Sequence, residues 1–345
     1  MTTELLAASI RPPSAARAED IRRHLDDLTK PPGSLGRIED LACRLAGILG
    51  DPPPPLFPRT VVVLAGDHGV TTRGVSAYPP EVTGQMCRNI ADGGAAVSVL
   101  ARVVGADVVV ADFGVRRPVD HPGVLDRNVA RGTADLSVEP ALSPEAVERA
   151  VIAGAALVGQ FAPAARLIAV GEMGIGNSTA ASGVTAALLR CPVSAVVGPG
   201  TGVGRDGLER KRDALRSALR RVAAGASPLR VLAEVGGAEL AGLVGVVLAT
   251  AERGRPVVLD GFISTAAALV AARLAPAVTG YLFASHRSTE PGHALQLEAL
   301  GLDPILDLGL RLGEGSGAAL ALPMLDAAGA LLREMATFSD AGVSR

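Results

Sequence analysis

The amino-acid sequence predicts an α/β fold with a parallel sheet and flanking helices, on the basis of three observations. Short runs rich in β-branched residues alternate with longer runs rich in Ala and Leu. The short runs are apolar throughout, as strands covered on both faces should be. The 345 residues are 48% hydrophobic but only 2% aromatic, and they include 41 Gly. We therefore expect a core of Ala, Val and Leu in which helices pack close to the sheet.

Six apolar runs are expected to form the strands, at residues 60–69, 106–114, 165–174, 193–200, 256–262 and 278–286. Most of these runs end in Gly, Asp, His, Ser or Glu. Ligands of open parallel sheets bind in a crevice at the carboxyl ends of the strands. We therefore expect the polar and glycine residues that follow the strands to converge on one crevice.

The helical runs predict two parts of unequal size. The run 143–162 opens with Ser, Pro and Glu, which is a good capping signature for a helix between strands. Residues 15–28 and 314–337 are expected to be helices without a strand partner. The predicted division is a large α/β domain, residues 31–311, and a small helical domain made of residues 1–30 together with 312–345.

Charge and composition argue against two partners, nucleic acid and membranes. The formal net charge is −2, and no basic stripe with interleaved aromatic residues is visible, so nucleic acid is not expected. The N-terminus has no long apolar segment, and the most apolar run, 240–251, is too short to cross a bilayer. Cys43, Cys87 and Cys191 show no C-x-x-C pattern, which suits a reducing compartment. We expect a cytoplasmic protein that does not contact membranes.

The stretch "GEMGIGNSTAAS", residues 171–182, is a candidate phosphate site because it follows a strand and opens a helix. Glycines allow backbone N–H groups to face a phosphate, and a helix N-terminus favours negative charge. The alternative is an ordinary strand–turn–helix corner in which Asn177 or Ser178 caps the helix.

A second glycine-rich loop, "GPGTGVGRDG" at residues 198–207, is expected at the end of the next strand. Its last part has the spacing G-x-G-x-x-G, but no later strand ends in an acid that would bind a ribose. The following helix is basic. We favour a phosphate held by the loop amides and Lys211, against the alternative that Lys211 lies on a solvated helix face.

Two further stretches offer polar side chains. His286, Glu290 and His293 do not have the spacing of a known zinc site, and Pro291 interrupts the helix that such ligands would need, so no metal is expected.

The stretch "VSAYPPEVTGQM", residues 75–86, contains three side chains that offer hydrogen bonds beside apolar atoms, as a pocket for an aromatic ligand requires. They are Ser76, Tyr78 and Gln85. The alternative is a capped helix start.

Glu314 is a single carboxylate among glycines at the start of a long apolar run, and the nearest cation in sequence is Arg311. Apolar surroundings raise the pKa of a carboxyl, whereas a helix N-terminus lowers it. Glu314 is therefore either a helix-start residue favoured by the helix dipole or an acid/base poised for catalysis.

Taken together, these stretches resemble the nicotinate-nucleotide–dimethylbenzimidazole phosphoribosyltransferase family. The resemblance runs from about residue 15 to about residue 335 and rests on motifs in the family's order: "LTKPPGSLGRIEDLA", "GDHGV", "GEMGIGNSTAAS", "GPGTGV", "SHRSTEPGH" and "LDLGLRLGEGSGAALALPMLDAA". It implies a Rossmann-like sheet, a small helical domain from both ends of the chain, a homodimer and no cofactor. Several long motifs in order are more specific than any single loop.

The resemblance also implies roles for individual residues. Glu314 is the general base, and Leu312 packs on the benzimidazole ring beside Ser76 and Gln85. The phosphoribosyl and nicotinate side is formed by Glu172, Gly174, Gly176, Asn177, Gly200, Thr201, Gly202, Lys211 and Ser288.

The implied reaction transfers the phosphoribosyl group of nicotinate mononucleotide to 5,6-dimethylbenzimidazole, and gives α-ribazole 5′-phosphate and nicotinate with inversion at C1′. The nicotinate nitrogen leaves from a pyridinium and becomes neutral, so its departure needs neither a proton nor a metal. The attacking base must lose a proton from its second nitrogen, and a carboxylate in reach can accept it.

Two other functions remain as alternatives. An NAD(P)-dependent dehydrogenase would use the G-x-G-x-x-G at residues 202–207, and the order of the motifs argues against it. A non-catalytic nucleotide-binding protein would use the same crevice without turnover, and Glu314 argues against that.

Overall fold

The computed structural model describes residues 2–344 and contains a six-stranded sheet in the order β3-β2-β1-β4-β5-β6. Every pair of neighbouring strands is parallel. The strands are β1 (Arg59–Gly66), β2 (Asp107–Gly114), β3 (Val124–Asp126), β4 (Leu167–Met173), β5 (Val257–Leu259) and β6 (Leu282–Ala284). The sheet winds outward in both directions from the β1–β4 pair, which confirms the predicted α/β class and its Rossmann-like order.

The strands form because their apolar residues are buried on both faces. β1 is buried along its whole length, with Thr60 opposite Asp107 of β2 and Ile168 of β4. Neighbouring side chains enter different cores, since Val62 belongs to the cluster on one face and Val63 to the cluster on the other. This arrangement explains why the sequence runs are apolar throughout rather than alternating.

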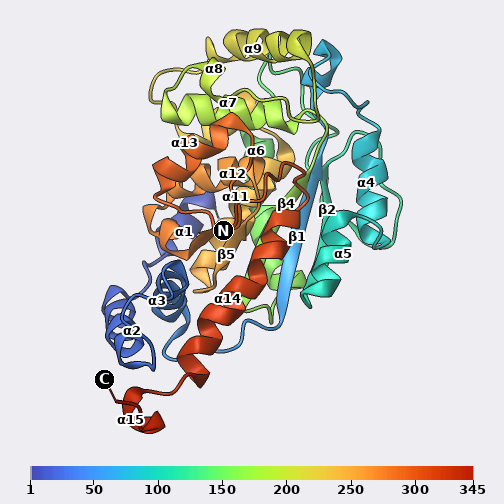
Figure 1. Ribbon diagram of the computed structural model, residues 1–345. Helices are drawn as coiled ribbons and strands as arrows, with labels where there is room; N and C mark the ends of the chain where they lie inside the picture. The colour runs from blue at the N-terminus through green and yellow to red at the C-terminus, as the bar shows by residue number, and fades with distance from the viewer. Residues whose placement is uncertain (1, 345) are drawn as a thin grey trace.

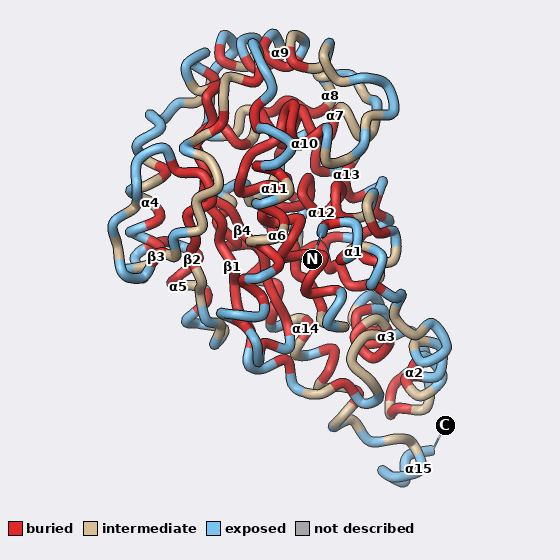
Figure 2. The backbone as a smooth tube through the Cα atoms, turned by 180° about the vertical axis from the view of Figure 1, so that it is seen from behind, coloured by how far each residue is buried: buried red, intermediate tan, exposed pale blue. Residues whose placement is uncertain are grey.

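Helices cover both faces of the sheet (Figure 1). One face carries α1 (Thr3–Ser9), α6 (Pro144–Phe161), α10 (Pro228–Val235), α11 (Ala238–Glu252) and α12 (Phe262–Leu274). The other carries α2 (Ala15–Asp27), α3 (Arg37–Leu49), α4 (Val82–Ala91), α5 (Ala96–Val103) and α14 (Ser316–Glu334). Figure 2 shows buried backbone concentrated in the strands, α11 and α12. The expected helix at 143–162 is α6, capped by Ser143 as predicted.

Beyond the carboxyl ends of the strands, at the top of Figure 1, lies a further layer. It contains the 3₁₀ helix η1 (Gly69–Arg73), α7 (Asn177–Leu189), α8 (Val193–Val196), α9 (Arg205–Leu219) and α13 (Pro291–Leu300). The 3₁₀ helix η2 (Pro276–Tyr281) precedes β6, and the short α15 (Phe338–Ala341) follows α14. Within residues 2–344, no helix combines the length and apolar character that crossing a bilayer requires.

The predicted strand at 193–200 is wrong. Residues 193–196 form α8, and Val196 and Val197 are buried among helices instead of in the sheet. An apolar run of this length is compatible with a buried strand or a buried helix. The next strand along the chain after β4 is β5, and β3, which has three residues, was not predicted.

Two close helix contacts depend on glycine. α6 and α11 cross with almost no side chain between them: a Cβ on Gly154 would overlap the carbonyl of Gly242, and a Cβ on Gly245 would overlap the carbonyl of Val151. The small-residue composition therefore brings α11 close to both α6 and the sheet, as the sequence predicts.

The end of α14 that lies away from Glu314 packs against α3, which in turn packs against α2 (Figure 1). A backbone bridge joins Leu28 to Thr337. Ile21, Leu25 and Leu325 belong to the same buried cluster as strand residues of β1 and β4. The division between residues 31–311 and the two ends of the chain stays a prediction.

Candidate active site

The candidate site lies at the carboxyl ends of β1, β4 and β5, where the strand order reverses direction. Ligands of open α/β sheets bind at this point. Five carboxyl groups are buried there: Asp67, Glu172, Glu239, Asp260 and Glu314. Burying this many carboxyls is unfavourable unless they are paired, hydrogen-bonded or protonated, so their partners indicate what each one does.

Glu314 is held in an uncommon backbone conformation. Its φ is +65°, and the flanking Gly313 and Gly315 have φ of +88° and +92°. A left-handed backbone is costly for a residue other than glycine and is often found at functional sites. The neighbouring strand makes room for it, because a Cβ on Gly171 of β4 would overlap the backbone of Glu314. The turn is therefore in direct contact with the centre of the sheet.

The Glu314 carboxyl has the properties of a proton acceptor. The residue is 6% exposed, and its Oε2 atom has no hydrogen-bond partner among residues 2–344. Burial raises the pKa of Glu314, and a hydrogen bond from the backbone of Val97 partly opposes this. A carboxyl with a raised pKa and one uncommitted oxygen can accept a proton at neutral pH.

Glu172, at the end of β4, lies directly beside this turn. A Cβ on Gly313 would be 2.6 Å from the Oε1 atom of Glu172. Burial, together with the negative charges of Asp260 and Glu239, raises the pKa of Glu172 to about 8, although a hydrogen bond from the Asn177 side chain opposes the rise. Glu172 therefore holds its proton more tightly than an ordinary carboxyl.

A buried ion pair lies under the site. The Nε2 atom of His68 is 2.7 Å from Oε1 of Glu239, and both side chains are inaccessible to solvent. Burial alone would lower the pKa of His68, but the attraction and hydrogen bond of Glu239 raise it. The "GDHGV" stretch is thus fixed to the start of α11. A Cβ on Gly237 would be 2.5 Å from the His68 ring, so the pair also depends on glycine.

Lys211 of α9 points inward and does not lie on a solvated helix face. It is 2% exposed, and its Nζ atom donates to Ser178 Oγ and to the carbonyl of Gly198, each at 3.1 Å. Burial lowers the pKa of Lys211 to about 8, and the charge of Glu290 opposes the fall. The structure therefore places Lys211 between the two glycine-rich loops, as the phosphate hypothesis requires.

Glu290 joins this group from the loop before α13. Its Oε1 atom accepts a 2.8 Å hydrogen bond from the N–H of Gly200, while Oε2 has no partner among the described residues. Ser288 Oγ accepts from the N–H of Glu290 at 3.3 Å, and Ser288 N–H donates to Nδ1 of His293 at 2.9 Å. Three loops that are distant in sequence thus meet around Lys211.

The loop before α7 has a different cap from either one proposed above. The N-cap position is Gly176, with φ of +96° and no side-chain cap. The side chain of Asn177 instead donates to Glu172, and that of Ser178 accepts from Lys211. Gly174 lies so close to β1 that a Cβ would overlap the carbonyl of Gly66. The loop therefore connects the carboxyl cluster to the lysine.

The residues that are expected to bind the benzimidazole lie at the surface of the protein, at the edge of the candidate site. Ser76 Oγ is 3.1 Å from Oγ1 of Thr201, so the structure brings the loop that precedes α4 against the second glycine-rich loop. Tyr78 and Leu312 are 56% and 58% exposed, and Gln85 is also exposed. An exposed leucine two residues before Glu314 is a suitable surface for an aromatic ring.

The histidines of "SHRSTEPGH" are hydrogen-bonded within the protein. Nδ1 of His286 is 2.9 Å from Ser285 Oγ, and Nε2 of His293 is 3.1 Å from Thr265 Oγ1. Burial lowers the pKa of His286 to about 4 and that of His293 to about 3, so both are neutral at pH 7. Across residues 2–344, no three His, Cys, Asp or Glu side chains are grouped so that they could hold a metal ion.

The G-x-G-x-x-G stretch does not have the context of a dinucleotide site. It follows the short helix α8, whereas the fingerprint requires a strand before it. The expectation that the 198–207 loop follows a strand is therefore wrong, and the dehydrogenase alternative is not favoured.

Sequence reasoning missed Glu239 and Asp260. Glu239 is in the first turn of an apolar helix, which resembles an ordinary helix start. Asp260 directly follows β5 in "VVLDGF", and this position carried a usable signal, since polar residues that follow parallel strands face the crevice.

The chain is similar to known proteins along almost its whole length. A family model described as phosphoribosyltransferase matches residues 10–343. A Thermus thermophilus protein named nicotinate-nucleotide–dimethylbenzimidazole phosphoribosyltransferase is 54% identical over 326 residues, which cover 94% of this chain and 97% of that protein. A Mycobacterium avium protein of the same name is 51% identical over 342 residues, covering 98% and 97%. A crystal structure of the T. thermophilus enzyme of that name matches with a TM-score of 0.92 at 51% identity, covering 96% of this chain and 99% of that one.

Proposed function

Because the chain belongs to the phosphoribosyltransferase family of these relatives, we propose that it transfers the phosphoribosyl group of nicotinate mononucleotide to 5,6-dimethylbenzimidazole. The products are α-ribazole 5′-phosphate, the lower-ligand nucleotide of cobalamin biosynthesis, and nicotinate. The observation in the fold that carries the mechanism is the buried Glu314 carboxyl, with its raised pKa and free oxygen at the switch point of the sheet.

Glu314 acts as the general base. The lone-pair nitrogen of the benzimidazole forms a bond to C1′ from the face opposite nicotinate, so the anomeric centre inverts. The bond between C1′ and the nicotinate nitrogen breaks, and its electron pair neutralises the pyridinium. The benzimidazole becomes cationic on alkylation, and transfer of the proton on its second nitrogen to Glu314 removes that charge.

Lys211 and the surrounding loops bind the nucleotide. The ammonium of Lys211 provides a charge-assisted hydrogen bond to phosphate, and its present partners, Ser178 and the Gly198 carbonyl, are neutral groups that a phosphate can replace. Backbone and side-chain groups of the neighbouring loops complete this side: Glu172, Gly174, Gly176, Asn177, Gly200, Thr201, Gly202 and Ser288.

The benzimidazole binds between residues 75–86, which comprise a loop and the start of α4, and the turn that carries Glu314. Leu312 packs on the ring, and Ser76, Tyr78 and Gln85 provide hydrogen bonds around it. Support comes from the exposure of Leu312, which lies two residues before the base.

The enzyme functions as a homodimer in the cytoplasm. The family resemblance supports the dimer. The three cysteines support a reducing compartment, because all are free and two are buried. Sedimentation of the purified protein at micromolar concentration should give twice the mass of the 34.8 kDa chain.

Product analysis tests the function directly. The purified protein is incubated with nicotinate mononucleotide, with dimethylbenzimidazole, or with both, and the mixtures are analysed by mass spectrometry and NMR. We expect nicotinate and an α-configured ribazole phosphate only when both substrates are present. Nicotinate release without dimethylbenzimidazole would indicate a hydrolase, and binding of both substrates without turnover would indicate a nucleotide-binding protein.

A further inference from the structure

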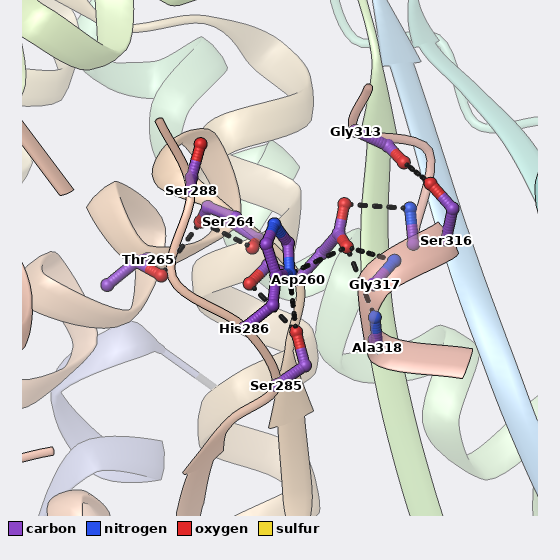
Figure 3. A network of polar contacts seen from close by, with 12 residues as sticks. Asp260, Ser264, Thr265, Ser285, His286, Ser288, Gly313, Ser316, Gly317 and Ala318 are labelled. Carbon is purple, nitrogen blue, oxygen red and sulfur yellow. Dashed lines mark hydrogen bonds and ion pairs between the residues drawn. The ribbon is translucent and has the colours of Figure 1, made fainter. Parts of the chain in front are cut away.

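The first turn of α14 is attached to a carboxylate from a different part of the chain. One oxygen of Asp260 accepts hydrogen bonds from the N–H groups of Gly317 (2.8 Å) and Ala318 (3.1 Å), and the other accepts from Gly315 (3.0 Å). Figure 3 shows these bonds converging on the Asp260 side chain. Three of the N–H groups that a helix start leaves without partners are satisfied by this one residue.

This attachment differs from the ordinary caps in the chain. α2 and α6 are capped by their own preceding serines, Ser14 and Ser143. At α14 the N-cap is Gly315, which has no side chain, and the capping carboxylate comes from the end of β5. The bond to Asp260 therefore fixes the start of α14 relative to the sheet, which a local cap cannot do.

Asp260 is itself held firmly. It is 1% exposed and directly follows β5. The hydroxyl of Ser285, which follows β6, donates to the backbone carbonyl of Asp260 at 3.1 Å and lies 2.9 Å from Nδ1 of His286. A Cβ on Gly317 would overlap the His286 ring, so glycine is needed for this approach. The carboxylate is a rigid anchor at the end of the sheet.

Glu314 is the residue that such an anchor would serve. It directly precedes Gly315, whose N–H binds Asp260, and its left-handed backbone is unfavourable unless neighbouring groups hold it. The hydroxyl of Ser316 also donates to the carbonyl of Gly313, so this bond closes the turn across Glu314. The bond to Asp260 and the bond across the turn together determine where the Glu314 carboxyl lies.

We propose that Asp260 is a positioning residue for Glu314, which, with help from Ser316, fixes the left-handed turn so that the Glu314 carboxyl faces the bound acceptor. The proposal rests on the proposed function, since it assumes that Glu314 accepts the proton. Asp260 does not touch the substrates. It acts through three backbone N–H groups, and an error of about 1 Å in the position of a catalytic group can cost about 10²-fold in rate.

A double-mutant cycle tests this, with four proteins: wild type, Asp260→Asn, Glu314→Gln and the double variant. Asparagine keeps the size of Asp260 but presents an NH₂ group toward at least one of the three donors. We expect Asp260→Asn to lower kcat about 10- to 100-fold with KM for both substrates within about twofold. In the Glu314→Gln background the same change should lower kcat by less than about threefold.

Ser143→Ala is the matched control, because it removes an ordinary cap that a serine forms on the helix directly following it. It should lower Tm without changing kcat at temperatures well below the melting transition. If Asp260→Asn shows the same pattern, Asp260 only stabilises the fold and the proposal is overturned. Equal loss of kcat in both backgrounds also overturns it, because Asp260 would then act independently of Glu314.

Two results separate this proposal from the one on which it rests. An inactive wild type, or full activity of Glu314→Gln, would contradict the proposed function or the role of Glu314 before Asp260 is considered. Should Asp260→Asn be recovered unfolded, the same cycle with Ser316→Ala decides, because the Ser316 hydroxyl closes the same turn across Glu314. Coupling of Ser316→Ala to Glu314 supports the anchored turn, and independence overturns it.

Discussion

Glu314 combines two properties that are each unfavourable for a glutamate, a left-handed backbone and a buried carboxyl. Neither property stabilises α14. A left-handed backbone is unfavourable for a glutamate, and burial disfavours the ionised carboxylate that the dipole of a helix start would favour. The combination is understandable if the position is set by the needs of the reaction. Residues of this kind should affect turnover far more than folding.

Glu314→Gln should therefore lower kcat by roughly 10²- to 10⁴-fold, the usual contribution of a positioned general base. Glutamine keeps the size of the side chain but cannot accept the proton. We expect Tm to stay the same or to rise slightly, because an acid is removed from a buried site. Single-turnover product formation at saturating substrates is the measurement, with exposed Glu298→Gln as the control. Near-normal turnover would return Glu314 to a structural role, with Glu172 the next candidate.

The buried carboxyls should also determine how stability depends on pH. The pKa of Glu172 is raised to about 8 by burial and by Asp260 and Glu239, and burial raises that of Asp260 to about 7. The folded protein therefore keeps protons that the unfolded chain has lost. The contribution of these groups to the free energy of unfolding is complete below their unfolded pKa, and it is lost as pH rises through the folded pKa.

We expect Tm to fall as the pH rises from 6.5 to about 8, the folded-state pKa of Glu172. Below pH 6.5 the buried histidines oppose this trend, because burial lowers the pKa of His286 and His293 from 6.5. Glu172→Gln should flatten the decline measured by calorimetry, and Glu298→Gln should not. If Tm declines with pH equally steeply in Glu172→Gln and in the wild type, Glu172 is ionised in the folded protein at neutral pH.

At the scale of secondary-structure elements, α9 supplies one inward-pointing cation to two loops. Lys211→Ala should weaken binding of nicotinate mononucleotide about 10- to 100-fold, a loss on the order of 1.5–3 kcal/mol for a hydrogen bond to a charged group. Binding of dimethylbenzimidazole should change little. Calorimetric titration with each substrate checks this, and Arg216→Ala, which changes an exposed residue of the same helix, is the control. Equal losses for both substrates would contradict a phosphate role for Lys211.

The contact between α6 and α11 should be the most sensitive to added volume. Gly245→Ala places a methyl group against the carbonyl of Val151. Overpacking of this kind typically costs about 1–3 kcal/mol. Gly204→Ala is the control, since a Cβ there would meet no heavy atom within 4 Å and the φ of Gly204 is an ordinary −74°. Urea unfolding of both variants measures the difference in their free energies of unfolding. Equal values would mean that α6 and α11 can move apart without loss of stability.

The elements that sequence predicted best are those with two agreeing signals. β1, β2 and β4 combine β-branched runs with polar residues at their ends, and α6 combines apolar spacing with a cap. Where only an apolar run was available, as at 193–200, the sequence could not distinguish a helix from a strand. β3 has three residues and is defined by its pairing with β2, which is a non-local property.

The candidate site was likewise predictable only where the signal is local in the sequence. Glu314 and Lys211 lie in glycine-rich stretches that are visible locally. The partners that position them are not visible in this way. Asp260 is contributed by a different strand, and its role depends on three N–H groups that come near it only after folding.

For the whole molecule, we expect turnover to survive exhaustive EDTA treatment. The leaving group becomes neutral as it departs, and a carboxyl of the chain accepts the proton, so no step requires a Lewis acid. Activity is measured before and after chelation, with Mg²⁺ or Zn²⁺ added back to separate samples. Loss on chelation followed by recovery with either ion would refute the metal-free mechanism.

The position of α14 in the sequence also sets an order in time. The last strand, β6, ends at Ala284, and the turn that carries Glu314 comes only afterwards. Synthesis proceeds from the N-terminus, and folding generally begins in the part that has emerged. The sheet, the two glycine-rich loops and Lys211 are therefore all made before the proton acceptor. A chain still attached to the ribosome at this stage would have its nucleotide-binding groups but no means of completing the transfer.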